Sequence, residues 1–360
     1  MLQALLRRLL PGLHAPLPKL DAETFILWEP CSHSHGEIVP GYAKYLLDLG
    51  YRVLVLLTPA RIDEGLFSRF SHPRLHVARL SQRQIRRFMR SADLSRAAGV
   101  MVTTAGKLPE RADHSLDLPK VFGGRVPRPL LLVEHEARRR IEAGHWDPRN
   151  ITLRRLMVPG VESVVVNPHY FGPVTRRPKN PKTVFLMAGA ARSKRRNQDM
   201  VLDAVRRLLA EGETGFELRL IGKPGKTALP DDLRSHVVET GRVSFERLYH
   251  EVEACDFVLT AFQRDNPDHA FYRTTGTTGS FQLAYGFRKP CIIQQEFAVG
   301  TALTAENSLF YDDDADLYHC LRRAIAMPGD SHAQMCSAMQ RESEALAQRS
   351  LAGLKGLIDG

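Results

Sequence analysis

The chain has 360 residues, of which 43% are hydrophobic and 25% charged, and its formal net charge is +10. This length is typical of two domains rather than one core, and the composition excludes a disordered chain. No apolar stretch approaches the roughly 20 residues that a membrane-spanning helix needs. The five cysteines are odd in number and show no CxxC spacing. We therefore expect reduced thiols in a cytoplasmic protein, not a disulfide framework.

The positive charge suits phosphorylated substrates, an anionic lipid surface or nucleic acid, or it serves only solubility. Basic residues do not alternate with aromatic ones and no zinc-finger spacing occurs, so we expect no nucleic-acid partner.

The first 14 residues, MLQALLRRLLPGLH, have the pattern of an amphipathic helix. One face is apolar and another basic, formed respectively by Leu2, Leu5, Leu6, Leu9 and by Arg7, Arg8. Charges before the apolar stretch and a cleavage site would indicate a signal peptide, and neither is present. Two interpretations stay open: the helix packs on its own protein, or residues 1–14 contact an anionic membrane at its inner face.

Short apolar runs alternate with helical patterns through the first half of the chain. The runs are Thr24–Trp28, Arg52–Leu57, Leu75–Ala78, Gly99–Thr103, Pro129–Val133 and Ser163–Val166, and the helical patterns include Val39–Leu49 and Gln82–Ala97. Apolar runs without polar alternation are typical of strands buried on both faces, and hence of a parallel sheet.

A stretch rich in proline and basic residues, Gly172–Thr183, predicts an interdomain linker. The alternation then restarts, with strands at Val184–Ala188, Glu217–Ile221, Val237–Val238, Asp256–Thr260 and Cys291–Gln294, and helices at Asn197–Glu211, Ser244–Ala254, Ser280–Phe287, Leu317–Ala326 and Ala333–Leu354. The predicted fold class is α/β: two doubly wound Rossmann-like domains that face each other across a cleft. We assign residues 1–175 to the first domain, 176–335 to the second, and 336–360 to a helix that packs back on the first.

Two segments of the second half are suited to bind an anion at the carboxyl edge of the sheet, where open α/β sheets bind ligands. Gly189 leaves a strand and precedes a basic turn that contains Arg192, Lys194 and Arg196. Cations at a helix start oppose its dipole, so a bound anion would explain them; otherwise the turn is a solvated basic loop. The next strand ends in Gly222 and Lys223.

A third segment, YRTTGTTGSFQLAYGFRKP from Tyr272, gathers small hydroxyl residues and glycines ahead of a helix. Backbone N–H groups can approach a ligand closely there, and the hydroxyls add donors. Thr277, Thr278, Gly279 and Ser280 would therefore cradle a phosphate or diphosphate without a Walker motif. The alternative is a flexible turn with a Ser or Thr N-cap.

These motifs together resemble the GT-B glycosyltransferases. The segment from Gly189 to Arg196 resembles the nucleotide-sugar-binding domain of the family-4-like group, as do LRLIGKPG, VSFERLYHEVEACDFVLTAF and QLAYGFRKPCII. HSHGEIVPGYAKYLLDLGYRVLVL and LLLVEHE resemble the acceptor-side domain, so the resemblance spans about Thr24 to Leu354. It implies that Arg192 and Arg196 hold the diphosphate of a nucleoside-diphosphate sugar, above residues 277–280.

One departure concerns acidic residues. Family-4 retaining enzymes carry two glutamates seven residues apart, the second just inside this helix. Here the helix start reads Ser280-Phe-Gln, the upstream position has no glutamate either, and Glu296 is the nearby acid. The stereochemical outcome therefore stays open.

The loop EPCSHSHGE after the first strand offers candidate bases, namely His33, His35 and Glu37. An inverting transferase needs a base for the acceptor hydroxyl, and a histidine with its ordinary pKa of about 6.5 suits that role. His135, between Glu134 and Glu136, is a second candidate. The alternatives are turn formation and a metal site at Cys31, His33 and His35. Alternate residues in a loop are poor evidence for a metal site, so we expect none.

The leading hypothesis is a glycosyltransferase that acts on a glycan or lipid-linked acceptor in bacterial-type surface polysaccharide or glycoconjugate synthesis. Basic side chains and a helix N-terminus would neutralise the leaving diphosphate, so we expect no bound cofactor, only a nucleotide sugar as co-substrate. A nucleotide-sugar epimerase on the same fold is one alternative. A catalytically inactive binding or scaffold protein is another, which the missing glutamates favour and the basic turn opposes.

Overall fold

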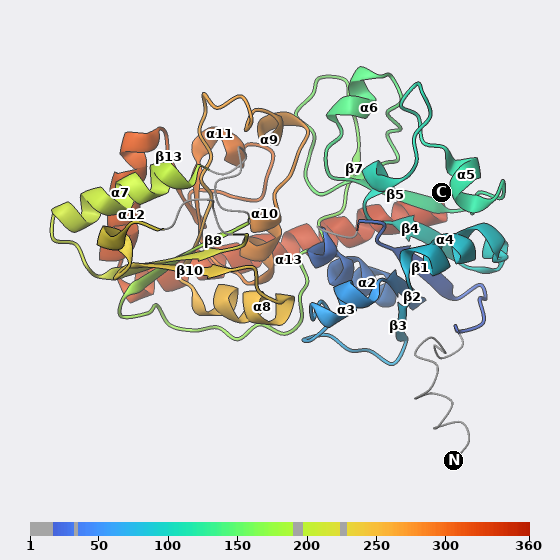
Figure 1. Ribbon diagram of the computed structural model, residues 1–360, viewed down its shortest axis with the longest axis horizontal. Helices are drawn as coiled ribbons and strands as arrows, with labels where there is room; N and C mark the ends of the chain where they lie inside the picture. The colour runs from blue at the N-terminus through green and yellow to red at the C-terminus, as the bar shows by residue number, and fades with distance from the viewer. Residues whose placement is uncertain (1–16, 32–34, 190–196, 224–228) are drawn as a thin grey trace, which may run out of the picture.

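The computed structural model describes residues 17–31, 35–189, 197–223 and 229–360. These residues form two parallel sheets, one of seven strands in the order β3-β2-β1-β4-β5-β6-β7 and one of six in the order β10-β9-β8-β11-β12-β13 (Figure 1). In both sheets the order reverses beside the first strand, at β1/β4 and β8/β11, as in doubly wound folds. The predicted α/β class with two Rossmann-like halves is confirmed.

The first sheet contains β1 (Thr24–Trp28), β2 (Arg52–Leu57), β3 (Leu75–Arg79), β4 (Gly99–Val102), β5 (Leu130–Glu134), β6 (Ile151–Thr152) and β7 (Val164–Val165). Its helices are α2 (Val39–Asp48), α3 (Pro59–Asp63), α4 (Gln82–Ser91), α5 (Leu118–Phe122) and α6 (Arg138–Glu142), with 3-10 turns η1 (Gly36–Ile38), η2 (Leu94–Arg96) and η3 (Ala105–Lys107). The helix predicted over Gln82–Ala97 is too long, because Ala92 adopts an extended conformation and ends it.

The second sheet contains β8 (Thr183–Ala188), β9 (Phe216–Ile221), β10 (Val237–Gly241), β11 (Phe257–Leu259), β12 (Cys291–Gln294) and β13 (Ser308–Tyr311). Its helices are α7 (Gln198–Ala210), α8 (Phe245–Ala254), α9 (Phe271–Thr274), α10 (Gly279–Gly286), α11 (Gln295–Ala298), α12 (Asp314–Ala326) and α13 (Gly329–Asp359), with the 3-10 turn η4 (Asp231–Leu233). The sequence patterns did not predict β6 or β13.

Both sheets are covered by helices on both faces, which explains the apolar runs. Every residue of β1 and of β8 is buried. One face of the first sheet packs against α2 and the end of α13, and the other packs against α4 and α5. The second sheet packs α8 and α10 on one face and α7 and α12 on the other.

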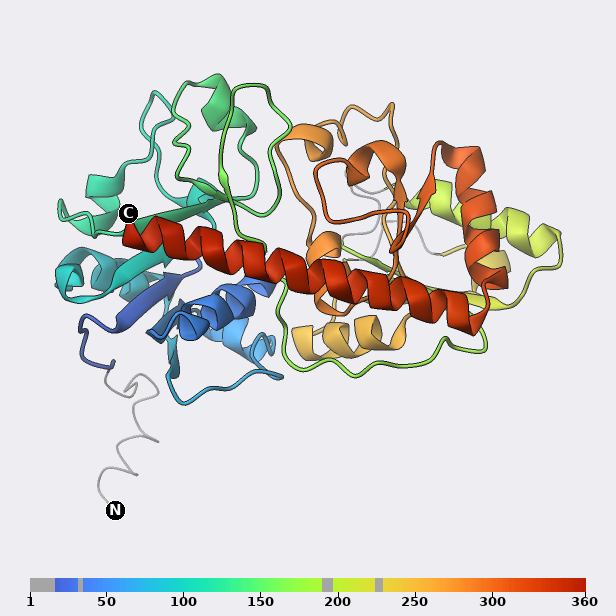
Figure 2. The same cartoon turned by 180° about the vertical axis from the view of Figure 1, so that it is seen from behind.

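Helix α13 runs along both halves of the molecule (Figure 2). Its 31 residues span about 46 Å at 1.5 Å per residue. Met339 and Leu346 pack into the core of the second half, whereas Leu354 and Leu357 pack into that of the first. No strand or helix forms between β7 and β8. The exact boundary at residues 175 and 176 stays a prediction.

None of the helices in the described ranges is both long enough and apolar enough to span a bilayer. Residues 1–16, including the predicted amphipathic segment, lie outside those ranges.

Candidate functional site

A cleft of about 680 Å³ lies between the carboxyl edges of the two sheets. The first half contributes residues that follow β1, β4 and β5, and the second half contributes residues that follow β8 and begin α10. The predicted catalytic residues and most of the described donor-site residues line it, namely His35, Glu37, His135, Gly189, Thr277, Thr278, Gly279 and Ser280.

Two groups of predicted donor residues are not placed in this cleft. Gly222 and Lys223 follow β9, which lies on the opposite side of β8 from β11, and they do not line the cleft. The basic turn with Arg192, Lys194 and Arg196 lies outside the described residues, as does His33.

The start of helix α10 brings the two halves of the cleft together. Thr278 is its N-cap, and the Thr278 hydroxyl accepts a hydrogen bond from the Ser280 backbone N–H at 3.4 Å. A Cβ atom on Gly279 would lie 3.1 Å from Oε1 of Glu37, a residue of the first half. The Glu37 carboxylate therefore reaches the N-terminus of α10, where the helix dipole favours negative charge.

Gln282 supplies a buried polar group to the cleft. The sequence analysis noted only that the helix start has this glutamine and no glutamate, and did not predict it as a site residue. Its side chain lines the cleft and is only 1% exposed. Within the described ranges, neither its amide nitrogen nor its amide oxygen has a hydrogen-bond partner. An unpaired buried amide costs about 1–3 kcal/mol, so such a group is usually satisfied by a ligand or a water. The Thr277 hydroxyl on the same wall is buried and unpaired in the same sense.

His135 faces Gln282 and the α10 start from the other wall. Its Nε2 lies 2.8 Å from the Thr103 carbonyl oxygen. A carbonyl can only accept, so Nε2 carries the hydrogen and Nδ1 carries the lone pair. Burial, reinforced by the neighbouring His35, lowers the pKa of His135 to about 3. The ring is therefore neutral at neutral pH, and its free lone pair lies on Nδ1.

His35 packs directly on His135, with ring centroids 4.1 Å apart. Its backbone has φ of 64°, in the left-handed region that a residue with a side chain rarely adopts. Such strained positions often occur at functional sites, because neighbouring structure must hold them.

Glu29 organises the loops behind the two histidines. It is buried at the end of β1 and accepts hydrogen bonds from the Cys31 backbone N–H at 2.5 Å and from the hydroxyls of Thr103 at 2.7 Å and Thr104 at 2.8 Å. Burial raises the pKa of Glu29 to about 8 in spite of these bonds. Thr104 Oγ1 in turn lies 3.4 Å from His135 Nε2. Glu29 was not among the predicted site residues. Its position directly after the apolar run Thr24–Trp28 is the feature of the sequence that could have identified it.

Glu134, the residue before His135, forms an internal ion pair. Its carboxylate lies 2.5 Å from Nη1 of Arg140, and both side chains are buried. Burial raises the pKa of Glu134 to about 7, although Arg140 opposes the shift.

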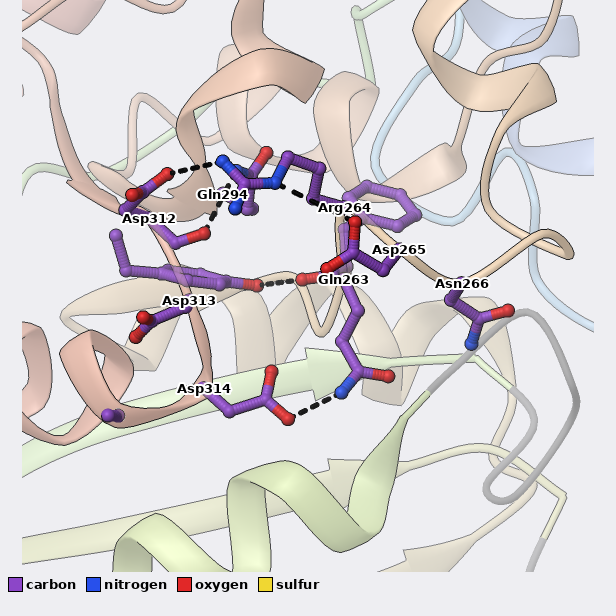
Figure 3. Close-up of a pocket in the computed structure, with 11 residues that line it drawn as sticks. Gln263, Arg264, Asp265, Asn266, Gln294, Asp312, Asp313 and Asp314 are labelled. Atoms are coloured by element: carbon purple, nitrogen blue, oxygen red, sulfur yellow. Dashed lines mark hydrogen bonds and ion pairs between the residues drawn. The ribbon is translucent and has the colours of Figure 1, made fainter.

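A second pocket, of about 540 Å³, lies further along the same sheet edge, beyond the ends of β11, β12 and β13 (Figure 3). Its polar groups largely pair with each other: Gln263 Nε2 donates to Asp314 at 2.5 Å, and Gln294 Nε2 donates to the Asp312 carbonyl at 3.0 Å. Arg264 pairs with Asp312 at 3.3 Å. None of the predicted site residues within the described ranges lines it, so we place the candidate site in the interdomain cleft.

Across the described residues, no three His, Cys, Asp or Glu side chains are grouped as metal ligands. The hypothetical set of Cys31, His33 and His35 includes a residue outside those ranges.

No protein-family model and no curated protein sequence matches the chain. Solved structures do resemble it. AviGT4, a glycosyltransferase involved in avilamycin A biosynthesis, aligns with a TM-score of 0.56 at 16% identity, covering 95% of this chain and 99% of that one. Anabaena Alr3699/HepE, in complex with UDP and glucose, gives 0.57 at 14% identity, with 93% and 100% covered.

A mutant of T4 phage BGT in complex with UDP-glucose aligns with a TM-score of 0.53 at 11% identity, covering 94% of this chain and 100% of that one. At these identities the likeness concerns the fold, whereas the family-4-like detail stays a prediction. The two parallel sheets, their strand order and the cleft between them agree with these structures, and the chain therefore has the GT-B fold.

Proposed function

We propose that this chain is a glycosyltransferase that moves a sugar from a nucleoside-diphosphate sugar to a hydroxyl group of a glycan or lipid-linked acceptor. The observation that carries the proposal is the pairing of two walls in one cleft. One wall offers a helix N-terminus with the unpaired buried amide of Gln282, and the other offers the neutral imidazole of His135. Two proteins of similar fold were solved in complex with UDP and glucose or with UDP-glucose, which supports a nucleotide sugar as donor.

On this proposal the donor diphosphate lies at the start of α10. The backbone N–H of Gly279 and the hydroxyl of Thr277 would face it, and the helix dipole would stabilise the charge that grows on the leaving group. The predicted contribution of Arg192 and Arg196 belongs to the same arrangement. The Gln282 amide would bond a hydroxyl of the donor.

The acceptor is activated from the opposite wall. His135 takes the proton of the acceptor hydroxyl at Nδ1 as that oxygen attacks the anomeric carbon, and the bond from this carbon to the phosphate oxygen breaks. The nucleoside diphosphate leaves with the electron pair. A nearby diphosphate would raise the pKa of His135 toward the working range, because negative charge favours the imidazolium. His35 and Glu37 are the remaining candidates for this role.

We further propose that the acceptor lies at a membrane, as in surface polysaccharide or glycoconjugate synthesis. A basic face of helix α4 supports this part of the proposal independently of the cleft. Four exposed arginines project from it, and none forms an ion pair in the described ranges: Arg83, Arg86, Arg87, Arg90. The segments outside those ranges contain no Asp or Glu that could pair with them.

Helix α4 contacts the loop that leads to the cleft, and it shares a hydrophobic cluster with the first described residues of the chain. Gln82, its first residue, donates to the Pro30 carbonyl at 3.4 Å, on the loop that leads to His35. Leu17 and Leu20, the described residues that follow the amphipathic sequence, pack on the same hydrophobic cluster as Ile85 and Met89 of α4. Peripheral contact with an anionic inner membrane surface would thus present the acceptor side of the cleft to lipid.

The test is a donor screen by thermal shift with UDP-, GDP-, ADP-, dTDP- and CMP-sugars, followed by product analysis with the best donor. Binding to the native state alone should raise the melting temperature. A new sugar nucleotide from donor alone would indicate an epimerase instead. Binding without turnover in the presence of glycan and lipid-linked acceptors would favour an inactive binding protein, and no binding by any nucleotide sugar would refute the proposal.

A further inference from the structure

Helix α9 lies immediately before the donor segment and ends at the boundary between the two halves (Figure 1). The last carbonyl groups of a helix have no partners within it and must find donors elsewhere. Here the carbonyls of residues 272, 273, 274 and 275 all accept hydrogen bonds from the first half of the chain. We call this set of contacts the interdomain strap.

Arg154, just after β6, provides the larger part of the strap. Its Nη1 donates to the Tyr272 carbonyl at 2.6 Å, and its Nη2 lies 3.3 Å from the Arg273 carbonyl. Nη2 also donates to the Val299 carbonyl at 2.6 Å, just past the end of α11. One guanidinium thus bonds the C-terminal carbonyls of two helices, where a cation is favoured by both dipoles.

Backbone contacts complete the strap. The Met157 N–H donates to the Thr274 carbonyl at 2.9 Å, and the Ala137 N–H donates to the Thr275 carbonyl at 3.2 Å. Glu136 and Gly276 form an antiparallel bridge. The chain that carries His135 is therefore paired with the chain that runs, three residues later, into Gly279 of α10.

The environment of Arg154 is unusual for a charged side chain. It is 5% exposed, and in the described part of the chain it forms no ion pair, so carbonyl dipoles alone compensate its charge. Burial lowers the pKa of Arg154. Gly300 has φ of +72°, and a Cβ atom there would lie 2.7 Å from the Met157 sulfur and 3.4 Å from Arg154 Nη2. The surrounding chain is shaped to admit the guanidinium.

We infer that Arg154 is a positioning residue that sets the distance between the base on the first half and the donor segment 277–280 on the second. It touches neither reacting group and acts through the backbone of Tyr272 and Arg273. This inference rests on the proposed function for its catalytic consequence, whereas its structural part is independent of it. Loss of the guanidinium should free the end of α9 and let residues 277–280 move away from His135.

The experiment compares Arg154→Met and Arg154→Lys with Arg155→Met, whose side chain is exposed beside it. Amide hydrogen exchange in the peptide 272–283 should become at least about tenfold faster in Arg154→Met, with peptides of the β8–β9 core unchanged, because local opening is what the strap opposes. Lysine keeps the charge but lacks the planar guanidinium that bonds the carbonyls at the ends of both α9 and α11. Arg154→Lys should therefore recover little of this protection. Arg155→Met should match the natural chain.

Kinetics with the donor found in the screen provide the second measurement. Arg154→Met should raise the donor KM and lower kcat by about tenfold or more each, since both donor contact and base geometry depend on the strap. Unchanged exchange in 272–283 at 25 °C, or faster exchange with unchanged kinetics, would overturn the inference. If Arg154→Met does not fold, Arg154→Lys gives the same two measurements. Faster exchange in a chain that binds no nucleotide sugar would instead refute the proposed function and leave the strap standing.

Discussion

Nε2 of His135 lies 2.8 Å from the carbonyl oxygen of Thr103, and this contact fixes which nitrogen of the ring can accept a proton. Because the carbonyl requires a donor, the lone pair lies on Nδ1. Neither the spacing of His135 in the sequence nor its neighbours indicated this tautomer.

Replacing the base should remove turnover while sparing the donor site. His135→Ala is expected to lower kcat by about 10²–10⁴, with UDP affinity changed little, because general-base catalysis acts in the chemical step. Steady-state kinetics and calorimetry with UDP measure the two quantities. His76→Ala serves as control, since that exposed histidine of β3 lies outside the cleft lining. Near-normal turnover in His135→Ala combined with loss in His35→Ala would assign the base to His35.

Glu37 is expected to weaken donor binding electrostatically. Its carboxylate oxygen lies next to Gly279 at the α10 start, where the proposed diphosphate would sit. Glu37→Gln removes a like charge, so UDP should bind about three- to tenfold more tightly, as for a partly screened pair of charges. Titration calorimetry at two salt concentrations measures the change and its screening. Weaker UDP binding in Glu37→Gln would instead mean that the carboxylate itself contacts the donor.

Gln282 should show opposite effects on stability and binding. Gln282→Leu removes a buried amide that has no partner in the described ranges, so the unliganded protein should gain about 1 kcal/mol of unfolding free energy. The same change should weaken binding of UDP-sugars by about tenfold if the amide bonds the donor. Urea denaturation and donor titration test the two halves. Gln334→Leu, an exposed amide on α13, is the matched control. A loss of stability in Gln282→Leu would contradict the unpaired state of the amide.

Glu29 should make stability depend on pH. Burial raises its pKa in the folded protein to about 8 from the ordinary value of 4.5, so between these values the native state holds a proton that the unfolded chain has lost. The corresponding stabilisation is complete below the unfolded pKa and is lost as the pH rises through about 8. Glu134, with its pKa raised to about 7, acts in the same direction but at lower pH.

Stability is therefore best measured between pH 7 and pH 8.5. This window lies above the ordinary pKa of His135, 6.5, so the histidine is largely neutral in both the folded and the unfolded state and adds little to the slope. Urea denaturation should show the natural chain losing stability across this window and Glu29→Gln losing clearly less, because glutamine carries no titrating proton. An equal slope in both proteins would show that Glu29 is already ionised at pH 7.

The arginine face of α4 should bind anionic vesicles. Replacing its four arginines by glutamine is expected to weaken flotation with phosphatidylglycerol vesicles by at least about tenfold at low salt, since each basic residue near such a surface contributes about 1 kcal/mol. The control replaces four exposed arginines of the second half and so makes the same change in net charge: Arg234, Arg247, Arg322, Arg341.

Deletion of residues 1–14 separates the two parts of the membrane contact. If the apolar face of this segment inserts, its loss should weaken flotation further and at all salt concentrations, whereas the α4 contribution should be screened by salt. Full-length protein that fails to float at low salt would remove the membrane from the proposed function.

Local patterns determined most of the fold. Runs such as Arg52–Leu57 and Val184–Ala188 predicted buried parallel strands, since a strand covered on both faces needs apolar residues at every position. The small hydroxyl residues before α10 predicted its start, and Thr278 is its N-cap. Strands β6 and β13 were not predicted. Strand β6 has only two residues. Each of these two strands is defined by its pairing with a neighbouring strand rather than by a periodic pattern in its own sequence.

The site depended on contacts between distant parts of the chain. Gly222 and Ser280 both follow strands at one sheet edge, yet only Ser280 lines the cleft, because strand order decides which loops meet at the switch point. Arg154 and Tyr272 are 118 residues apart in sequence, and nothing near either one predicts that a guanidinium bonds that carbonyl. The sequence by itself determined most of the segments that become strands and helices, because that choice is largely encoded in local periodicity. Only the tertiary structure decided which side chains share the cleft and which polar groups remain unpaired there, because packing two domains sets those distances.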